Sequence, residues 1–141
     1  MKKILTGHKR LADFLSKQEH IKLAYLFGSV VSGKAGKLSD MDIAILIDDL
    51  LDKKEKFEFQ LKLISDLTDV LRTDRVDLVV MNDAPLSLKF EIIKANYPLF
   101  VRDIKEKIDF EQKVLSRYLD RRYYEKMAAS TFLKKVAVNG I

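Results

Sequence analysis

The sequence predicts an α/β fold, a small mixed sheet of about four strands with flanking helices and a long C-terminal helix. Short apolar runs of strand length alternate with segments whose apolar residues recur every three or four positions, which is typical of amphipathic helices. The chain has 141 residues, 48% of them hydrophobic, which is enough for one compact domain and too few for two. No repeat or linker interrupts it. We therefore expect a single domain over residues 1–141, with its core at about 8–103 and a helical extension at about 104–137.

The composition narrows the classes of function. No cysteine occurs, which excludes disulfides, thiolate metal sites and a cysteine nucleophile, and which fits a reducing cytoplasm. The longest wholly apolar run, Ile43–Ile47, is far too short to span a membrane. The net charge of +5 could attract nucleic acid or an acidic partner, but it is interpreted as an ordinary basic surface. We expect no membrane contact and no direct nucleic-acid partner; a homo-oligomer is left open.

The first half of the chain supplies a helix and two strands. Residues 8–19 form the first predicted helix, because apolar residues recur on one side of it. Ile21–Phe27 follows as a strand that ends at Gly28-Ser29. Asp42–Ile47 is the second strand; after its acidic start it is apolar on both faces, as a central strand covered by helices on both sides would be.

A helix and a third strand come next. Asp52, with Glu55 three residues later, predicts a capping box that opens the helix. Its expected buried stripe is Phe57, Leu61, Ile64, Leu67 and Leu71. Arg75–Met81 is the third strand, and the turn residues 82–85 start another helix.

The chain is expected to end in a short strand and a long helix. Tyr97–Val101 is the fourth strand, and Asp109, with Gln112 three residues later, predicts the start of a helix that runs to about Lys135. Apolar residues recur every four positions along it, which favours packing on the sheet or on a partner over stacking of its tyrosines on nucleic acid: Leu115, Leu119, Tyr123 and Met127.

The stretch "LFGSVVSGKAGKLSDMD", residues 26–42, contains the most informative motif. Its Gly33-Lys34 resembles a nucleotide-binding P-loop, but Ala35 stands where that loop needs a metal-binding hydroxyl. The stretch ends in Asp40-Met41-Asp42, and alternate residues of a strand share a face. Two such carboxylates repel each other, and a magnesium ion would remove the repulsion. Taken alone, so short a pattern is better interpreted as two solvated aspartates in a loop.

A third carboxylate strengthens the metal-site interpretation. Asp77 interrupts an apolar strand that has no packing use for a charge. If the third strand lies beside the second, Asp77 joins Asp40 and Asp42, and three carboxylates can bridge two metal ions for an in-line displacement at phosphorus. Asp77 is also our candidate for the group that accepts the proton of the attacking hydroxyl. Asp74, the competing candidate, is expected in a turn before the strand.

These residues carry a resemblance to a known superfamily. Gly28-Ser29, ten residues, and Asp40-Met41-Asp42 resemble the Gly-Ser-x10-Asp-x-Asp signature of the DNA polymerase β-like nucleotidyltransferases, and the small size is similar to that of their minimal members. Residues 20–103, including "VDLVVMNDAPLSLKFEIIKANYPLFVRD", look like the MntA-type antitoxins. The resemblance implies a nucleotide-binding palm in which Gly28 and Ser29 contact the triphosphate of ATP. It also implies that Asp40, Asp42 and Asp77 are catalytic and hold Mg²⁺, with two ions expected.

The resemblance also implies an activity. Such proteins transfer AMP from ATP to a hydroxyl, here a tyrosine of a cognate HEPN-domain (HepT-like) ribonuclease toxin, and so act as its antitoxin. Two alternatives stay open: transfer to a small hydroxylated molecule such as an aminoglycoside, and a protein that only masks the toxin. One departure concerns Ser32, where many relatives carry a basic residue; Lys34 and Lys37 lie nearby in the sequence.

Overall fold

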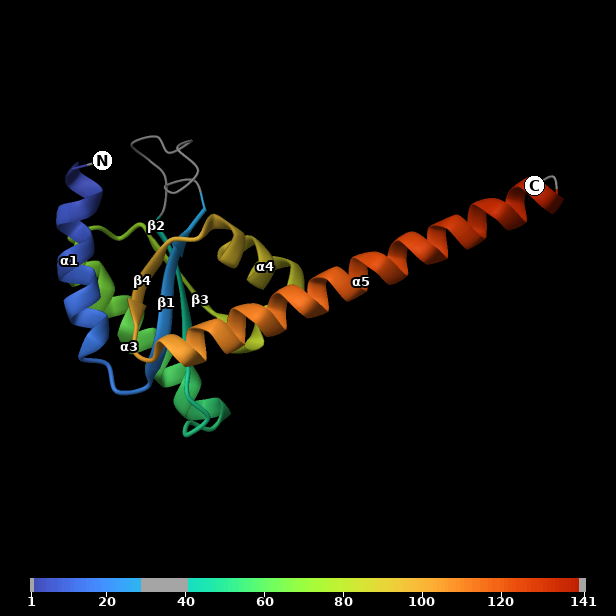
Figure 1. Cartoon of the computed structure of the whole chain (residues 1–141). Helices are drawn as coiled ribbons and strands as arrows, with labels where there is room; N and C mark the ends of the chain where they lie inside the picture. Colours follow the sequence, from blue (N-terminus) through green and yellow to red (C-terminus); the bar gives the residue numbers. More distant parts are fainter. Residues whose placement is uncertain (1, 29–40, 140–141) are drawn as a thin grey trace.

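The structure is a computed structural model, which describes residues 2–28 and 41–139. A four-stranded sheet in the order β3-β2-β1-β4 has helices on both faces (Figure 1). β1 pairs antiparallel with β2 and with β4, whereas β3 pairs parallel with β2. The predicted mixed sheet of four strands is therefore confirmed. The strands are β1 (Ile21–Phe27), β2 (Met41–Ile47), β3 (Val76–Val80) and β4 (Pro98–Val101).

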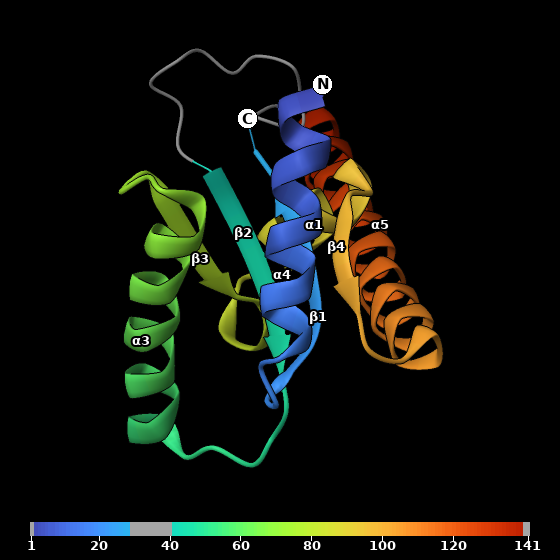
Figure 2. The same ribbon diagram turned by 90° about the vertical axis from the view of Figure 1, so that its left-hand side faces the viewer.

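One face of the sheet is covered by α1 (Lys2–Ser16) and α3 (Lys53–Leu71), as Figure 2 shows. The core on this face is built from fully buried aliphatic side chains of the two helices and of the central strands. Burial of such side chains is the main source of stability for a domain of this size. The residues include Leu11, Leu15, Ile21, Leu26, Ile43, Ile45 and Leu67.

The opposite face is covered by α4 (Leu86–Ala95) and by the first turns of α5 (Ile104–Asn139) (Figure 1). Tyr25 is fully buried there and donates a hydrogen bond of 2.7 Å from its hydroxyl to Oε1 of Glu111 on α5. The Nζ atom of Lys107 lies 2.6 Å from the same oxygen, Oε1 of Glu111, and forms an ion pair with it. Burial, together with the hydrogen bond to Glu111, raises the pKa of the Tyr25 phenol. This network fixes the base of α5 to the sheet.

The helix after β2 begins where the sequence predicts, but only the C-terminal part of its predicted buried stripe is correct. Asp52 accepts from the backbone N–H of Glu55 at 2.8 Å, and Oε1 of Glu55 accepts from the Asp52 N–H at 3.2 Å, which completes the capping box. Phe57 and Leu61 are nevertheless 62% and 54% exposed, so their predicted burial is wrong. Leu67 of the predicted stripe is buried, and Ile64 and Leu71 pack against the core. Leu63, which the prediction left out, is buried beside them.

Two predicted boundaries also shift. The first helix spans Lys2–Ser16 and not 8–19, because one glycine costs a helix only about 1 kcal/mol and does not end it. After Ser16 the chain turns into β1, with the N–H of Gln18 bonded to the carbonyl of Leu15 at 3.1 Å. The third strand ends at Val80 and continues as the short 3₁₀ turn η1 (Met81–Asp83).

The last helix starts earlier than predicted. It begins at Ile104, because Oδ1 of Asp103 accepts from the Lys105 N–H at 2.9 Å and its carbonyl accepts from the Lys107 N–H at 3.1 Å. Asp103 with Glu106 repeats the spacing read at Asp109, which lies inside the helix. The sequence thus contains two similar helix-start patterns, and the prediction placed the helix start at the second of them. The helix also continues to Asn139.

The C-terminal part of α5, residues 119–138, is called the outer segment. Figure 1 shows it extending away from all other elements. The residues expected to pack on the sheet or a partner are exposed, including Leu119, Tyr123 and Met127, so packing on the sheet is wrong. Within the described part of the chain, no helix is both long and apolar enough to cross a membrane.

Candidate active site

The carboxylate edge is the name used here for Gly28, Asp42 and Asp77, which meet where β2 and β3 begin. Asp42 is the second residue of β2 and Asp77 the second residue of β3. The parallel register pairs Asp42 directly with Asp77. Neighbouring strands lie about 4.8 Å apart, and paired residues of parallel strands project to the same face. The condition that the sequence analysis set for Asp77, that β3 lies beside β2, is thus met.

The two carboxylates lie on the α4 side of the sheet. Asp42 alternates with Ile43, which packs under α1 and α3, and shares its face with Ala44, which packs with Tyr25 and Ile92. Asp77 lies on the edge strand and is exposed. An edge position lets water reach the carboxylate, which explains why a strand of this apolarity tolerates a charge.

Gly28 is required by the carboxylate edge itself. Its φ is +81°, a left-handed conformation that residues with a side chain rarely adopt. A Cβ atom at this position would lie 2.9 Å from Cγ of Asp42 and in collision with its Oδ2. Asp42 pairs with Phe27 across the β1–β2 ladder, so its side chain lies directly against the Gly28 backbone. The glycine therefore leaves room for the acidic side chain.

Two predicted site residues, Ser29 and Asp40, lie outside the described residues, as do Ser32, Lys34 and Lys37. The structure brings together Asp42 and Asp77 of the three predicted carboxylates. Within residues 2–28 and 41–139, no group of three or more histidines, aspartates or glutamates is arranged to hold a metal ion. Asp74 precedes β3 and is exposed, so it lies outside the strand, as expected.

The geometry favours a hard cation and an anionic ligand. Two carboxylates held on adjacent strands repel each other, and a divalent ion with a preference for oxygen ligands relieves that repulsion. Magnesium bound by such carboxylates keeps coordination positions for phosphate oxygens. The pair can therefore take part in chemistry at a metal-bound phosphate.

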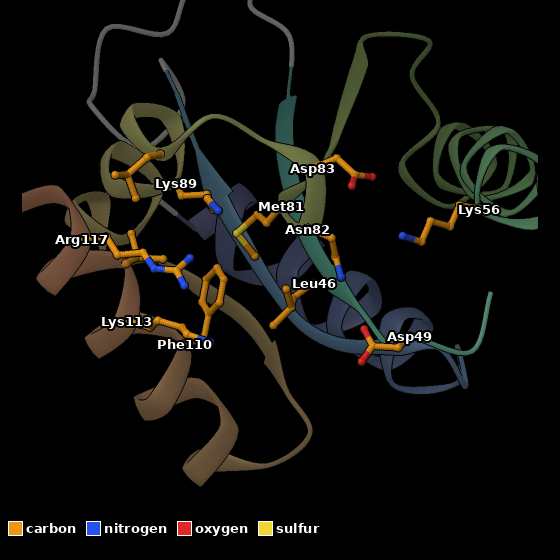
Figure 3. Close-up of a pocket in the computed structure, with 12 residues that line it drawn as sticks. Leu46, Asp49, Lys56, Met81, Asn82, Asp83, Lys89, Phe110, Lys113 and Arg117 are labelled. Carbon is orange, nitrogen blue, oxygen red and sulfur yellow. The ribbon is translucent and has the colours of Figure 1, made fainter. Parts of the chain in front are cut away.

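A second feature, called the basic cavity, lies at the other end of β2. It has a volume of about 350 Å³ and a floor that includes Leu46, Met81 and Phe110. Figure 3 shows Lys89, Lys113 and Arg117 on one side of it and Asp49 and Lys56 on the other. Leu46 is four residues along the strand from Asp42, or about 13 Å. The cavity is thus separate from the carboxylate edge.

Sequence reasoning missed the basic cavity. Lys89 comes from α4, whereas Lys113 and Arg117 come from α5, and only the packing of the two helices brings them together. One signal was present: Lys113 and Arg117 are four residues apart and so share a helix face. Nothing in the sequence around Lys89 indicated that it lies near these two residues.

Comparisons with known proteins agree with this geometry. Residues 9–105 match the family described as polymerase beta, nucleotidyltransferase. The chain is 34% identical over 110 residues to the protein adenylyltransferase MntA of Shewanella oneidensis, which covers 78% of this chain and 73% of that protein.

Solved structures extend the comparison to the fold. A toxin–antitoxin crystal structure with AMP-PNP contains a chain that is 26% identical, with a TM-score of 0.67, covering 89% of this chain and 98% of that one. A complex of tri-AMPylated Shewanella oneidensis HEPN toxin with MNT antitoxin contains a chain with a TM-score of 0.63 over 92% of this chain and 98% of that one. At 24% identity the latter shows the fold alone. The protein belongs to the polymerase β nucleotidyltransferase family.

Proposed function

We propose that this protein is a magnesium-dependent nucleotidyltransferase that transfers AMP from ATP to a tyrosine of a HEPN-domain toxin and thereby acts as its antitoxin. The observation that carries the proposal is the direct pairing of Asp42 with Asp77 beside Gly28. The name of the curated relative, protein adenylyltransferase MntA, supports the reaction. The toxin–antitoxin complex with AMP-PNP supports the nucleotide. Because the reaction consumes ATP, we place it in the cytoplasm.

The donor set at the carboxylate edge fits magnesium. Asp42 and Asp77 present carboxylate oxygens, the ligand type that Mg²⁺ prefers, and Asp40 precedes Asp42 by two residues. We assign these three residues as the ligands of two ions. When bound, the ions neutralise phosphate charge and stabilise the attacking and leaving oxygens of an in-line displacement.

The chain's own residues would bind the nucleotide and move a proton. Gly28 and Ser29 would hold the triphosphate, because the glycine backbone can approach a phosphate and the serine offers a hydroxyl and an amide. The tyrosine oxygen of the toxin attacks the α-phosphorus of ATP and forms the new P–O bond as pyrophosphate leaves. Asp77, exposed on its edge strand, would accept the phenolic proton.

The two alternatives are less well supported. A chain of 141 residues has little room for a separate domain that binds an aminoglycoside-like acceptor. A protein that only masks a toxin would have no use for two carboxylates paired on adjacent strands beside Gly28. The same pair therefore favours an enzyme over a binding protein.

The test is an AMP-transfer assay. The purified protein is incubated with ATP labelled at its α-phosphate, magnesium and the HEPN-domain toxin proposed as its partner, and Asp42→Ala is run in parallel. We expect label on a toxin tyrosine with the wild type and none with Asp42→Ala. Label only on small hydroxylated molecules would favour the first alternative. Neutralisation of the toxin that survives Asp42→Ala would favour the second.

A further inference from the structure

The outer segment of α5 exposes apolar side chains, and the basic cavity lies at its base. We propose that together they form the surface that docks the toxin, and that the matching surface of the toxin is a helix-lined apolar groove with acidic residues at its rim. This inference rests on the proposed function for the identity of the partner. The position of the surface, by contrast, follows from exposure, charge and packing in the described structure.

The outer segment exposes apolar side chains without burying them in its own domain. Leu119, Tyr123 and Met127 recur every four residues and thus form a stripe on one side of the helix. They are 54%, 61% and 50% exposed. Phe132 is 66% exposed and lies about 100° around the helix from Leu133, on a different side from the stripe. A groove that contacts the helix on more than one side would bury all of them.

Few contacts among the described residues stabilise the outer segment. Just before the outer segment, the ring of Tyr118 stacks on Phe90 of α4, with the ring centroids 3.7 Å apart. Beyond it, among the described residues, a single ion pair between Arg121 and Glu125 bridges turns of the helix. Most helix stability in proteins comes from tertiary packing of an apolar face, so burial against a partner would stabilise the segment.

Charge argues for an acidic partner and against a second copy of this chain. The outer segment has five basic and two acidic residues. An antiparallel pair of outer segments centred near residue 128 would place Lys134 and Lys135 opposite Arg122 and Arg121, which repel them. A parallel pair would place each cation opposite itself. Neither arrangement is favourable, whereas carboxylates on a different protein would attract the segment.

The basic cavity gives an independent reason to expect acidic groups. Four basic side chains line the cavity against two acidic ones, Asp49 and Asp83. Among the basic ones, Lys89, Lys113 and Arg117 form no ion pair with any carboxylate that the structure describes. Lys113 and Arg117 are also like charges one helical turn apart, an arrangement that is unfavourable without a counter-charge. Carboxylates from a docked protein would supply it. The cavity adjoins the base of the outer segment, so one partner can reach both.

The docking surface lies on the side of the sheet where transfer would occur. α5 packs on the α4 face, with Phe110 in the same cluster as Ala44, whose face Asp42 shares (Figure 1). A protein held by the outer segment therefore approaches from the side of the carboxylates. α1 and α3 cover the opposite face.

The test compares two matched double variants of the full-length protein. Tyr123→Ser/Met127→Ser removes stripe residues that are four positions apart and 61% and 50% exposed. Phe57→Ser/Leu61→Ser removes two apolar residues with the same spacing on α3, which are 62% and 54% exposed. Binding to the toxin is measured by calorimetry without ATP. We expect the first variant to raise the dissociation constant by about 100-fold or more and the second to leave it unchanged.

The charge part of the proposal has its own arm. Lys113→Glu/Arg117→Glu should weaken binding by about 10-fold or more and reduce its salt dependence, because attraction to acidic groups is replaced by repulsion. Unchanged binding by either α5 variant would overturn the proposal, as would equal weakening by the α3 variant. Wild-type self-association that Tyr123→Ser/Met127→Ser abolishes would instead identify a second copy. Binding to RNA or to anionic vesicles, lost in that variant while toxin binding persists, would also overturn it.

Failure of the docking proposal and failure of the proposed function give different results. Asp42→Asn should bind the toxin as tightly as wild type while transferring no AMP. If wild type binds through α5 but transfers nothing, the proposed function is wrong and the docking surface stands. If wild type transfers AMP and the α5 variants bind normally, only the docking surface is wrong.

Discussion

The carboxylate edge and the outer segment of α5 differ in how far contacts within the protein hold their side chains in place. At the carboxylate edge, two acidic side chains are fixed by strand pairing, and Gly28 is adapted to the position of one of them. Along the outer segment, apolar side chains lie in water on a helix with one ion pair between its turns in the described structure. The geometry of the carboxylate edge is therefore set by contacts within the domain. The outer segment lacks internal partners, which is typical of a surface completed by another molecule.

The difference separates two kinds of residue. Residues that act on phosphate must be held in place before the substrate arrives, so rigid strands carry them. Residues that recognise a partner can become ordered and buried only when the partner binds. Substitutions at the carboxylate edge should therefore change the rate of transfer, and substitutions in the outer segment should change affinity.

Loss of one edge carboxylate should have the largest effect. We expect Asp42→Asn to lower the transfer rate by about 1,000-fold, which corresponds to roughly 4 kcal/mol of transition-state stabilisation, because a proposed metal ligand is lost while the shape is kept. The control is Asp74→Asn, which changes an exposed aspartate just before β3. Single-turnover transfer of labelled AMP measures both. Equal losses in the two variants would mean that general negative charge matters, not the pairing with Asp77.

Gly28→Ala should damage both the fold and the site. A side chain at φ +81° collides with the Asp42 carboxylate, and such strain costs about 1–3 kcal/mol of unfolding free energy. Urea unfolding measures it. In an Asp42→Gly background the collision is absent and only the backbone strain remains, so the same substitution should cost less. Equal costs in both backgrounds would show that the carboxylate does not restrict this position.

Tyr25→Phe tests the anchor of α5. We expect a loss of about 1 kcal/mol in unfolding free energy, because the hydrogen bond to Glu111 is removed from a buried position. Tyr118→Phe is the control: its ring stacks on Phe90, and its hydroxyl bonds to no group among the described residues. An equal loss in both would contradict the role of the hydroxyl.

The network of Tyr25 and Glu111 also predicts that the free energy of unfolding depends on pH. The pKa of Tyr25 is raised in the folded protein, so its contribution is fully present below about pH 10, the ordinary pKa of tyrosine. The contribution is lost as the pH rises further towards the folded-state value. The stability advantage of wild type over Tyr25→Phe should shrink above about pH 10 in urea unfolding at a series of pH values. A constant difference would show that the phenol is not the group concerned.

The smallest effect is expected in the outer segment of the unbound protein. Leu133, 65% exposed, should tolerate Leu133→Ala with a change within about 0.5 kcal/mol, whereas the fully buried Leu67 should lose about 2–5 kcal/mol on Leu67→Ala. Thermal unfolding of the free protein measures both. A large loss at Leu133 would mean that the outer segment packs on its own domain in solution.

The sequence was most informative where local rules decide the structure. Asp77 interrupts an apolar strand, which predicted a carboxylate beside Asp42 if the third strand lies next to the second, and the structure brings Asp42 and Asp77 together. The stripe of α3 was misjudged because Phe57 and Leu61 are as apolar as Leu63, and only tertiary packing selects the buried side. The basic cavity could not be predicted, since it needs Lys89 on one helix to meet Arg117 on another.

The most direct test of the separation between chemistry and docking is the transfer rate as a function of toxin concentration. For Asp77→Asn we predict a maximal rate at least about 100-fold below wild type, with half-saturation at the same toxin concentration. For Tyr123→Ser/Met127→Ser we predict the wild-type maximal rate, reached only at much higher toxin concentration. If Asp77→Asn changed the half-saturation alone, or the α5 variant lowered the maximal rate alone, the assignment of the two regions would be contradicted.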